Sequence, residues 1–266
     1  MSEISPDSQT LRDVMDPARA AALCVSLGYG GQPMQAGSPL PPFFHHAYFW
    51  QTCPENMLGA DGHLAPGRGL IPDTGLPRRM WAGGRLEFLA PLILGKAAVR
   101  ESRVVEVTHK QGRSGRLAFV TLAHEVHQSG RVVLREWQEL VYCGPGAIRS
   151  DPPRAPANPE GAEPVAFSTT LLFRYSALTM NAHRIHYDLD YARRAEGYPG
   201  LVVHGPLIAQ FLMLKARREL GPLTGFRYRA SAPLIQGEEA MLCRDEHRLW
   251  LSGPDGRLCM EAEAQV

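Results

Sequence analysis

The chain has 266 residues, of which 44% are hydrophobic and 21% charged, values that exclude a disordered chain and leave room for two domains or two packed halves. Its 28 basic and 27 acidic residues give a net charge of +1, so composition excludes a general attraction to nucleic acid or to an anionic membrane. The five cysteines form no CxxC pair, which argues against a disulfide framework and a zinc site and favours reduced thiols.

The amino-terminal segment lacks the basic start and the apolar stretch of a signal peptide, and the chain contains no run of about 18 apolar residues. We therefore expect a cytoplasmic protein that does not span a membrane. Apolar residues at helical spacing predict a helix over residues 11–27, which the glycines that follow would end. Residues 32–84 hold much of the proline and glycine, which predicts a long irregular segment that covers the sheet rather than building it.

Three segments then carry apolar and β-branched residues at strand spacing, namely 96–109, 117–127 and 132–142. Short turns with glycine separate them, which predicts an antiparallel meander. Residues 144–164 are rich in proline, glycine, alanine and charged residues and show no hydrophobic periodicity, as is typical of an interdomain linker. We therefore predict an amino-terminal domain over residues 1–143 and a carboxy-terminal domain over residues 165–266.

The second half repeats this order of elements. The pattern predicts a short strand or entry segment at 167–174, a short helix at 188–196 with Asp188 as its N-cap, and a buried helix at 205–220. Strands are expected at residues 226–232, 239–246, 249–252 and 258–264. A helix followed by antiparallel strands in each half predicts an α+β duplication, in which each curved sheet wraps one central helix.

A dense cluster of polar residues stands at positions 175–188, between apolar neighbours. It contains Asn181, His183, Arg184 and His186. The unperturbed pKa of histidine, about 6.5, lies near neutrality, so two close histidines are suited to act as an acid and a base. The alternatives are metal binding, for which the HxxH spacing lacks a third ligand motif, and plain hydrogen bonding at a helix start.

The residues His204, Gly205 and Pro206 open the long helix. Proline suits a first turn because its missing N–H would be unpaired there. The remaining free N–H groups and the positive end of the helix dipole favour a developing oxyanion, with Gly205 as the backbone donor. For His204 alone, a hydrogen-bonded histidine near the core is the favoured interpretation.

These two elements resemble the MaoC-like hydratases and dehydratases, a family with a double hotdog architecture. The family motif runs approximately Ser-Gly-Asp-x-Asn-Pro-Leu-His, and residues 179–186, Thr-Met-Asn-Ala-His-Arg-Ile-His, occupy its place. A His-Gly pair opens the central helix of the family, as it does here. Asn181 departs from the usual Asp of the motif, and His183 departs from the usual Asn.

This variant of the motif is similar to the subgroup that contains mitochondrial 3-hydroxyacyl-thioester dehydratase and the bacterial mesaconyl-C4-CoA and itaconyl-CoA hydratases. The segment 77–88, Pro-Arg-Arg-Met-Trp-Ala-Gly-Gly-Arg-Leu-Glu-Phe, adds to the resemblance. The resemblance implies reversible addition of water to an enoyl-CoA thioester, here a short dicarboxylic one such as itaconyl-CoA or mesaconyl-C4-CoA, which gives citramalyl-CoA. It implies no metal and no cofactor, and we expect a homo-oligomer, a dimer.

The implied catalytic residues are His186, Asn181, His183 and Gly205. Because an amide does not titrate, Asn181 orients water or substrate at most, and proton transfer is left to His186 with His183 as its partner. Candidates for contact with the substrate are Arg184, His204, Arg78, Arg79 and Trp81. A guanidinium matches a phosphate or carboxylate, although a solvated surface arginine is an equal alternative, and Trp81 is as well explained by core packing as by an acyl tunnel.

Three alternative functions stay open. The first is an (R)-3-hydroxyacyl-thioester dehydratase of fatty acid metabolism, the second a hotdog subunit that binds an acyl thioester without turnover, and the third a thioesterase. The clustered histidines argue against a subunit that only binds.

Overall fold

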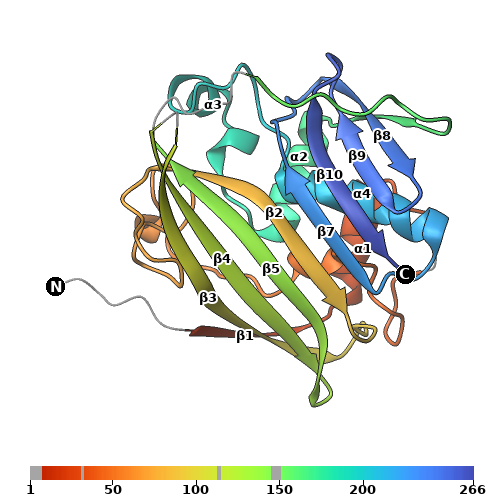
Figure 1. The fold of residues 1–266 in the computed structure, drawn as a ribbon. Helices are drawn as coiled ribbons and strands as arrows, with labels where there is room; N and C mark the ends of the chain where they lie inside the picture. Colours follow the sequence, from red (N-terminus) through yellow and green to blue (C-terminus); the bar gives the residue numbers. More distant parts are fainter. Residues whose placement is uncertain (1–7, 31–32, 113–114, 145–150) are drawn as a thin grey trace.

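Ten strands form one continuous antiparallel sheet through both halves of the chain (Figure 1). This computed structural model describes residues 8–30, 33–112, 115–144 and 151–266. The first half contributes β1 (Ser8–Val14), β2 (Arg78–Phe88), β3 (Ala97–Gly112), β4 (Gly115–Gln128) and β5 (Arg131–Cys143). The second half contributes β6 (Glu163–Ala166), β7 (Gly225–Ala230), β8 (Glu239–Asp245), β9 (Arg248–Ser252) and β10 (Leu258–Gln265). The order is β1-β3-β4-β5-β2-β7-β10-β9-β8-β6.

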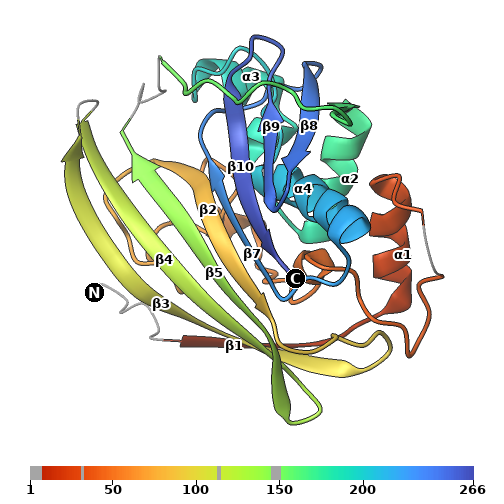
Figure 2. The same cartoon turned by 45° about the vertical axis from the view of Figure 1, so that its right-hand side comes forward.

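The helices pack against this sheet. They are α1 (Pro17–Ser26), α2 (Thr169–Thr179), α3 (Leu189–Arg194) and α4 (Gly205–Leu220), with the short 3-10 helices η1 (Phe44–Ala47), η2 (Glu55–Met57) and η3 (Arg184–His186). Figure 2 shows α4 lying across the second half of the sheet, where it contacts β7 to β10. Residues on nearly every side of α4 are buried, which confirms the buried helix predicted at 205–220.

The predicted meander is confirmed, but the irregular segment before it ends earlier than predicted. Residues 78–88 form β2, which pairs with β5 on one side and β7 on the other and so joins the two halves into one sheet. The two glycines of β2 permit this close pairing. A Cβ at Gly83 would lie 2.6 Å from the backbone oxygen of Tyr228, and a Cβ at Gly84 would lie 2.6 Å from the Tyr228 hydroxyl oxygen.

The prediction of a helix over residues 11–27 was wrong for its first residues, 11–16. Residues 8–14 form the edge strand β1, which pairs with β3 and alternates between exposed and half-buried side chains. The helix begins only at Pro17, and Asp16 is its N-cap, with its carboxylate accepting the Ala18 N–H at 2.9 Å. Apolar residues spaced three or four apart in 11–15 suited both structures, and pairing with β3 decided for the strand.

The segment 167–174 was also assigned wrongly, because most of it belongs to helix α2. The Ser168 hydroxyl accepts the Leu171 N–H at 3.1 Å and caps this helix. The short helix α3 confirms the next prediction, and the Asp188 carboxylate accepts the Tyr191 N–H at 3.0 Å as expected of an N-cap. The strands predicted in the last 45 residues are present as β7 to β10, with ends shifted by a few residues.

Part of the predicted linker, residues 145–150, lies outside the described residues. Residues 151–162 contain neither a helix nor a strand, and β6 begins at Glu163. The division into two domains therefore stays a prediction, whereas the α+β class is confirmed, with the two expected sheets joined edge to edge.

All five cysteines are free thiols, and four of them are buried. Among the described residues, no helix combines the length and the apolar character that crossing a membrane requires.

Candidate active site

A cavity of about 1240 Å³ lies between the two halves. One wall comes from β2 to β5 and from the loop of residues 58–77, and the other comes from residues 179–186 and the start of α4. Of the residues predicted from sequence, the cavity wall includes Asn181, His183, His186, Gly205, Arg79 and Trp81. Three others, Arg78, Arg184 and His204, do not line the cavity.

The end of α2 turns the chain into the cavity. Met180 caps the helix in the left-handed conformation, with φ of 53°, and the Asn181 N–H donates back to the Ser176 carbonyl at 2.9 Å. The Asn181 side-chain oxygen then accepts the His183 N–H at 3.0 Å, which fixes the next turn of chain. This contact leaves the Asn181 Nδ2 group as a donor at the cavity wall.

His186 is buried, with 6% of its surface exposed. Its Nδ1 lies 2.7 Å from the Val202 carbonyl oxygen, and because a carbonyl only accepts, Nδ1 carries the proton. The lone pair is therefore on Nε2. Burial, together with the nearby His204 and His183 rings, holds the pKa of His186 well below its ordinary value of 6.5. The result is a neutral imidazole with a basic nitrogen, in the wall of a cavity.

His204 supports His186 from behind. The two rings stack with centroids 3.6 Å apart and planes 21° apart, and His204 Nε2 lies 2.8 Å from the Ser176 hydroxyl. Burial, with the nearby His183 ring as the next cause, lowers the pKa of His204 to about 3, so this ring is neutral too. The contact with Ser176 fits the hydrogen-bonded histidine that was favoured from sequence. Gly205 follows as the first residue of α4, where the helix offers its N–H no internal partner.

Behind His183, a buried ion pair links the two halves. Arg78 Nε donates to Glu196 Oε2 at 2.6 Å, and both side chains are 4% exposed. His183 Nε2 lies 3.9 Å from Glu196 Oε1, too long for a hydrogen bond but close enough for electrostatic attraction. Burial alone would raise the pKa of Glu196, yet the His183 imidazole and the Arg78 guanidinium outweigh it and hold that pKa below its ordinary value.

The loop around Gly62 brings Asp61 and His63 close to His183. The sequence analysis did not single out Asp61 or His63. His63 Nδ1 donates to Asp61 Oδ2 at 2.9 Å, and the His63 ring lies 4.6 Å from the His183 ring. Burial, then the nearby Arg79, lowers the pKa of His63 to about 4. Burial alone would raise the pKa of Asp61, but the hydrogen bond from His63 outweighs it and lowers that pKa to about 2.

This loop docks directly onto the Asn181 segment. A Cβ at Gly62 would lie 1.9 Å from the Ala182 carbonyl oxygen, so only glycine fits there. The Arg184 N–H donates to the Asp61 carbonyl at 2.9 Å, and Arg184 NH1 donates to the Ala60 carbonyl at 3.0 Å. The rest of the Arg184 guanidinium donates to Asp188 Oδ2. Arg184 therefore ties the loop to η3.

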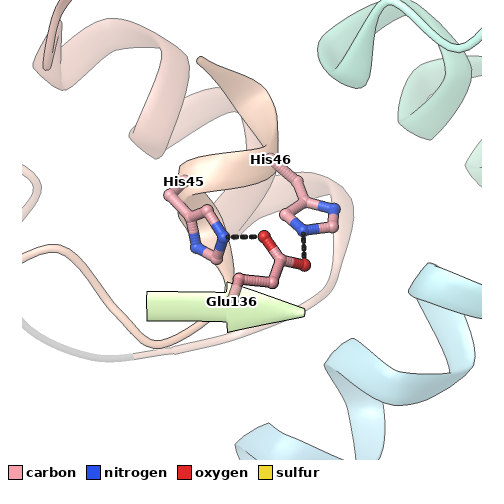
Figure 3. Close-up of side chains that lie close together, drawn as sticks. All are labelled: His45, His46 and Glu136. Carbon is pink, nitrogen blue, oxygen red and sulfur yellow. Dashed lines mark hydrogen bonds and ion pairs between the residues drawn. The ribbon is translucent and has the colours of Figure 1, made fainter. Parts of the chain in front are cut away.

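Among the described residues, two groups of side chains have possible metal-ligand atoms within 4.8 Å of one another, as a metal site would require. One is Asp61, His63 and His183, and the other is His45, His46 and Glu136. In the second group, the Glu136 carboxylate of β5 points between the two histidines of η1 (Figure 3). Hydrogen bonds inside each group already pair the carboxylates with imidazoles, so neither carboxylate depends on a cation for a partner.

Comparisons with known proteins identify the family of the chain. Residues 43–236 match the family described as hydroxyacyl-thioester dehydratase type 2. The chain is also 42% identical to the mesaconyl-C(4)-CoA hydratase of Chloroflexus aurantiacus over 267 aligned positions, which cover 97% of this chain and 95% of that protein.

Solved structures resemble the fold at lower identity. HtdX of Mycobacterium tuberculosis aligns with a TM-score of 0.69 and 17% identity, over 97% of this chain and 99% of that chain. A second M. tuberculosis protein, described as having a double hotdog fold, aligns with a TM-score of 0.62 and 12% identity, over 97% of this chain and 95% of that chain. These likenesses concern the fold alone, and they confirm the double hotdog architecture.

Proposed function

Since the chain belongs to the hydroxyacyl-thioester dehydratase type 2 family, we propose that it catalyses the reversible addition of water to the α,β double bond of an enoyl-CoA thioester. The observation that carries this proposal is the fixed tautomer of His186, which leaves a basic Nε2 in the cavity wall close to the start of α4. A basic nitrogen and a helix N-terminus are the two groups that this reaction needs.

Gly205 handles the charge that develops on the substrate. Its N–H donates to the thioester oxygen, and the positive end of the α4 dipole adds to this stabilisation. When water adds to the β carbon, the electrons of the double bond move toward that oxygen and form an enolate. Pro206, which has no N–H of its own, follows directly and leaves the Gly205 donor uncrowded.

His186 moves the proton. As the water oxygen bonds to the β carbon, its proton passes to His186 Nε2, and the same nitrogen then delivers that proton to the α carbon while the carbonyl re-forms. The Asn181 Nδ2 group and the His63 ring, both in the cavity wall, orient the water. The positions of Asp61 and His63 suit this role, because the carboxylate holds the imidazole in one tautomer.

The substrate class that we favour is a short dicarboxylic enoyl-CoA, with mesaconyl-C4-CoA or itaconyl-CoA as the substrate and citramalyl-CoA as the product. The support is the 42% identity to the mesaconyl-C(4)-CoA hydratase across nearly the whole chain. Of the arginines proposed from sequence to bind a phosphate or carboxylate, Arg79 fits best because it lines the cavity. Arg78 does not line the cavity, and its Nε donates to Glu196, while its two terminal nitrogens are buried without a partner in the described residues. The Arg184 guanidinium donates to Asp188.

A second candidate function is the dehydration of a longer (R)-3-hydroxyacyl thioester. The matched family description supports it, and so does the cavity volume of about 1240 Å³, which exceeds the need of a five-carbon dicarboxylic acyl group. We also retain the homodimer and the cytoplasmic location expected from sequence as proposals, to be checked by sedimentation and by cell fractionation.

The test is a panel of purified thioesters followed at the enoyl-thioester absorbance. We expect turnover of mesaconyl-C4-CoA or itaconyl-CoA to exceed that of crotonyl-CoA and of a long-chain 2-enoyl-CoA. A preference for the long chain would favour the second candidate function. Release of free CoA without loss of the double bond would point to a thioesterase and contradict the proposal.

A further inference from the structure

A row of polar side chains crosses the cavity-facing side of the amino-terminal half of the sheet. The strand register places Ser102 of β3 opposite His124 of β4, and His124 opposite Glu136 of β5. All three are buried. The next row of the same face carries Arg100 of β3 opposite Val126 and Leu134, and the latter two belong to the apolar core. Polar groups buried in such a face destabilise the fold unless each has a partner.

Glu136 has its partners within the protein. His45 Nε2 and His46 Nε2 each donate to one of its carboxylate oxygens, at 2.9 Å and 2.8 Å (Figure 3). Burial alone would raise the pKa of Glu136, but the two imidazoles outweigh burial and hold that pKa well below its ordinary value. Glu136 therefore stays ionised, and its charge opposes the loss of the proton from the half-buried Arg100 nearby.

Two donors beside Glu136 have no such partner within the part of the chain that the structure describes. Arg100 Nε and His124 Nε2 are both buried without a hydrogen bond. Each of these side chains forms a hydrogen bond through another nitrogen. Arg100 NH2 donates to the Phe49 carbonyl at 3.2 Å, and His124 Nδ1 lies 2.7 Å from the Ser102 hydroxyl. If that hydroxyl donates to Nδ1, the proton of neutral His124 is on Nε2.

This row belongs to the same cavity as the catalytic groups. Arg100, Ser102 and His124 line it, as do His186 and Gly205. The ring of His46, which holds Glu136, lies 5.8 Å from the Trp81 ring. Trp81 in turn packs on the start of α4, since a Cβ at Gly205 would lie 3.5 Å from Trp81 Cβ. Trp81 thus links the ring of His46 to Gly205.

We propose that Arg100 and His124 form a subsite for the free carboxylate of a short dicarboxylic enoyl thioester. The inference rests on the proposed hydratase function and gives that site its substrate class. A carboxylate has two oxygens and accepts both N–H groups at once, and a guanidinium binds it with charge-assisted hydrogen bonds. In mesaconyl-C4-CoA the carboxylate is attached to an alkene carbon, so its binding groups must share one cavity with the catalytic groups.

An apolar acyl chain does not suit this wall. It would cover Arg100 and His124 without accepting a hydrogen bond, and it would remove any water that could do so. The cavity wall also contains the cations Arg79, Lys110, Arg227 and Arg229, of which Arg79 lies beside His63 and is the rival that we test. A carboxylate bound by Arg79 would lie near the docked loop rather than near the polar row. Replacing Arg79 and replacing Arg100 should therefore have different effects on the same substrate.

The experiment measures kcat/KM for mesaconyl-C4-CoA and for crotonyl-CoA, which lacks the carboxylate. We expect Arg100→Met to lower the ratio of the two kcat/KM values by about tenfold or more, while turnover of crotonyl-CoA shows that the variant is folded. The matched control is Arg103→Met, on the same strand but exposed on the opposite face, and its ratio should not change. Arg100→Lys, which keeps the charge but loses the planar fork, should retain part of the preference.

A second measurement does not depend on turnover. Succinyl-CoA and butyryl-CoA have acyl groups of equal length and differ in a terminal carboxylate, and calorimetry gives the Kd of each. We expect the wild type to prefer succinyl-CoA, and Arg100→Met and His124→Leu to lose this preference. If Arg100→Met does not fold, Arg100→Lys and His124→Leu decide the matter.

The outcomes separate the two proposals. Wild-type protein that hydrates neither enoyl thioester but prefers succinyl-CoA through Arg100 would contradict the hydratase function and support the carboxylate subsite. Wild-type turnover with an unchanged ratio in Arg100→Met, an equal loss on both substrates in a folded variant, or a loss of preference in Arg79→Met alone would overturn the subsite.

Discussion

At the residue scale, one backbone contact decides what His186 can do. The Val202 carbonyl accepts a hydrogen bond from Nδ1–H, and burial keeps the ring neutral, so Nε2 is a base that needs no carboxylate to activate it. This arrangement gives a physical reason why Asn181 can stand where the family motif usually has an aspartate. The amide keeps the turn by accepting the His183 N–H and adds no charge to the buried site.

Replacement of His186 tests this assignment. We expect His186→Ala to lose about two to four orders of magnitude in hydration rate, which is the usual contribution of a general acid or base. Circular dichroism should show the fold unchanged, and His109→Ala, an exposed histidine on β3, serves as the matched control. Normal turnover by folded His186→Ala would remove this residue from the mechanism.

The pH dependence follows from the same ring. Because burial lowers the pKa of His186 below 6.5, the neutral, active form persists below that pH, and activity is lost only when the pH falls through the lowered pKa. We therefore expect the acid limb of kcat/KM to lie below pH 6.5. The measurement is a pH profile at low substrate concentration, and an acid limb at or above pH 6.5 would contradict the assignment.

Asn181→Asp restores the usual residue of the motif. The new carboxylate can still accept the His183 N–H, but its charge favours the imidazolium form of the neighbouring rings. We expect the acid limb to move to higher pH and the rate at pH 7 to fall. Paired pH profiles of the two proteins measure this shift. A large gain in activity would instead mean that the site is incomplete without a carboxylate.

At the element scale, the site depends on a loop from one half docked on a turn from the other. Gly62 has a φ of 90°, and its missing Cβ leaves room for the Ala182 carbonyl. We expect Gly62→Ala to push the loop from the turn and lower kcat/KM by about tenfold or more, since small misplacements of catalytic groups are costly. Kinetics with any accepted enoyl thioester measures this effect.

Gly67→Ala separates docking from backbone strain. Gly67 also has a left-handed conformation, with φ of 74°, but the nearest atom to an added Cβ is Asp73 Cβ at 3.9 Å. Both variants therefore carry similar strain, and only Gly62→Ala displaces the turn. Equal kinetic losses in the two would mean that the contact with Ala182 does not matter for catalysis.

At the scale of the whole molecule, the halves are joined by the pairing of β2 with β7 and by the buried ion pair of Arg78 with Glu196. Removing Arg78 leaves a buried carboxylate without its cation. We expect Arg78→Met to lower the free energy of unfolding by about 3 kcal/mol, measured by urea denaturation at pH 7. Arg194→Met, which breaks an exposed pair with Asp190, should cost about 0.5 kcal/mol or less.

The sign of the pH effect on this ion pair is fixed by Glu196. Its pKa is lowered from 4.5 in the folded protein, so its contribution to stability is present above pH 4.5 and is lost as the pH falls through the lowered value. The difference between wild type and Arg78→Met should therefore shrink in strong acid. A constant difference across that range would show that the lost packing of the Arg78 side chain, rather than its charge, causes the effect.

By itself, the sequence determined the features that depend on local spacing. The meander, α4 and the N-cap at Asp188 follow from periodicity and cap residues, and residues 179–186 with His204 and Gly205 carry the family resemblance in one short stretch each. In residues 11–15 two local structures suited the same pattern, and pairing with β3, which no short window shows, decided for the strand. In residues 167–174 the N-cap at Ser168 is a local signal for α2 that the sequence analysis did not use.

Only the tertiary structure decided which charged groups face the cavity. Asp61 and His63 lie more than 100 residues before His183, and the polar row on β3 to β5 becomes a row only through strand register. Arg100 carries no sequence motif, whereas Arg78 and Arg184, which do, lie outside the cavity lining and pair with Glu196 and Asp188. Spacing along a chain predicts neighbours within one element, but contacts between elements depend on how the sheet closes around the cavity.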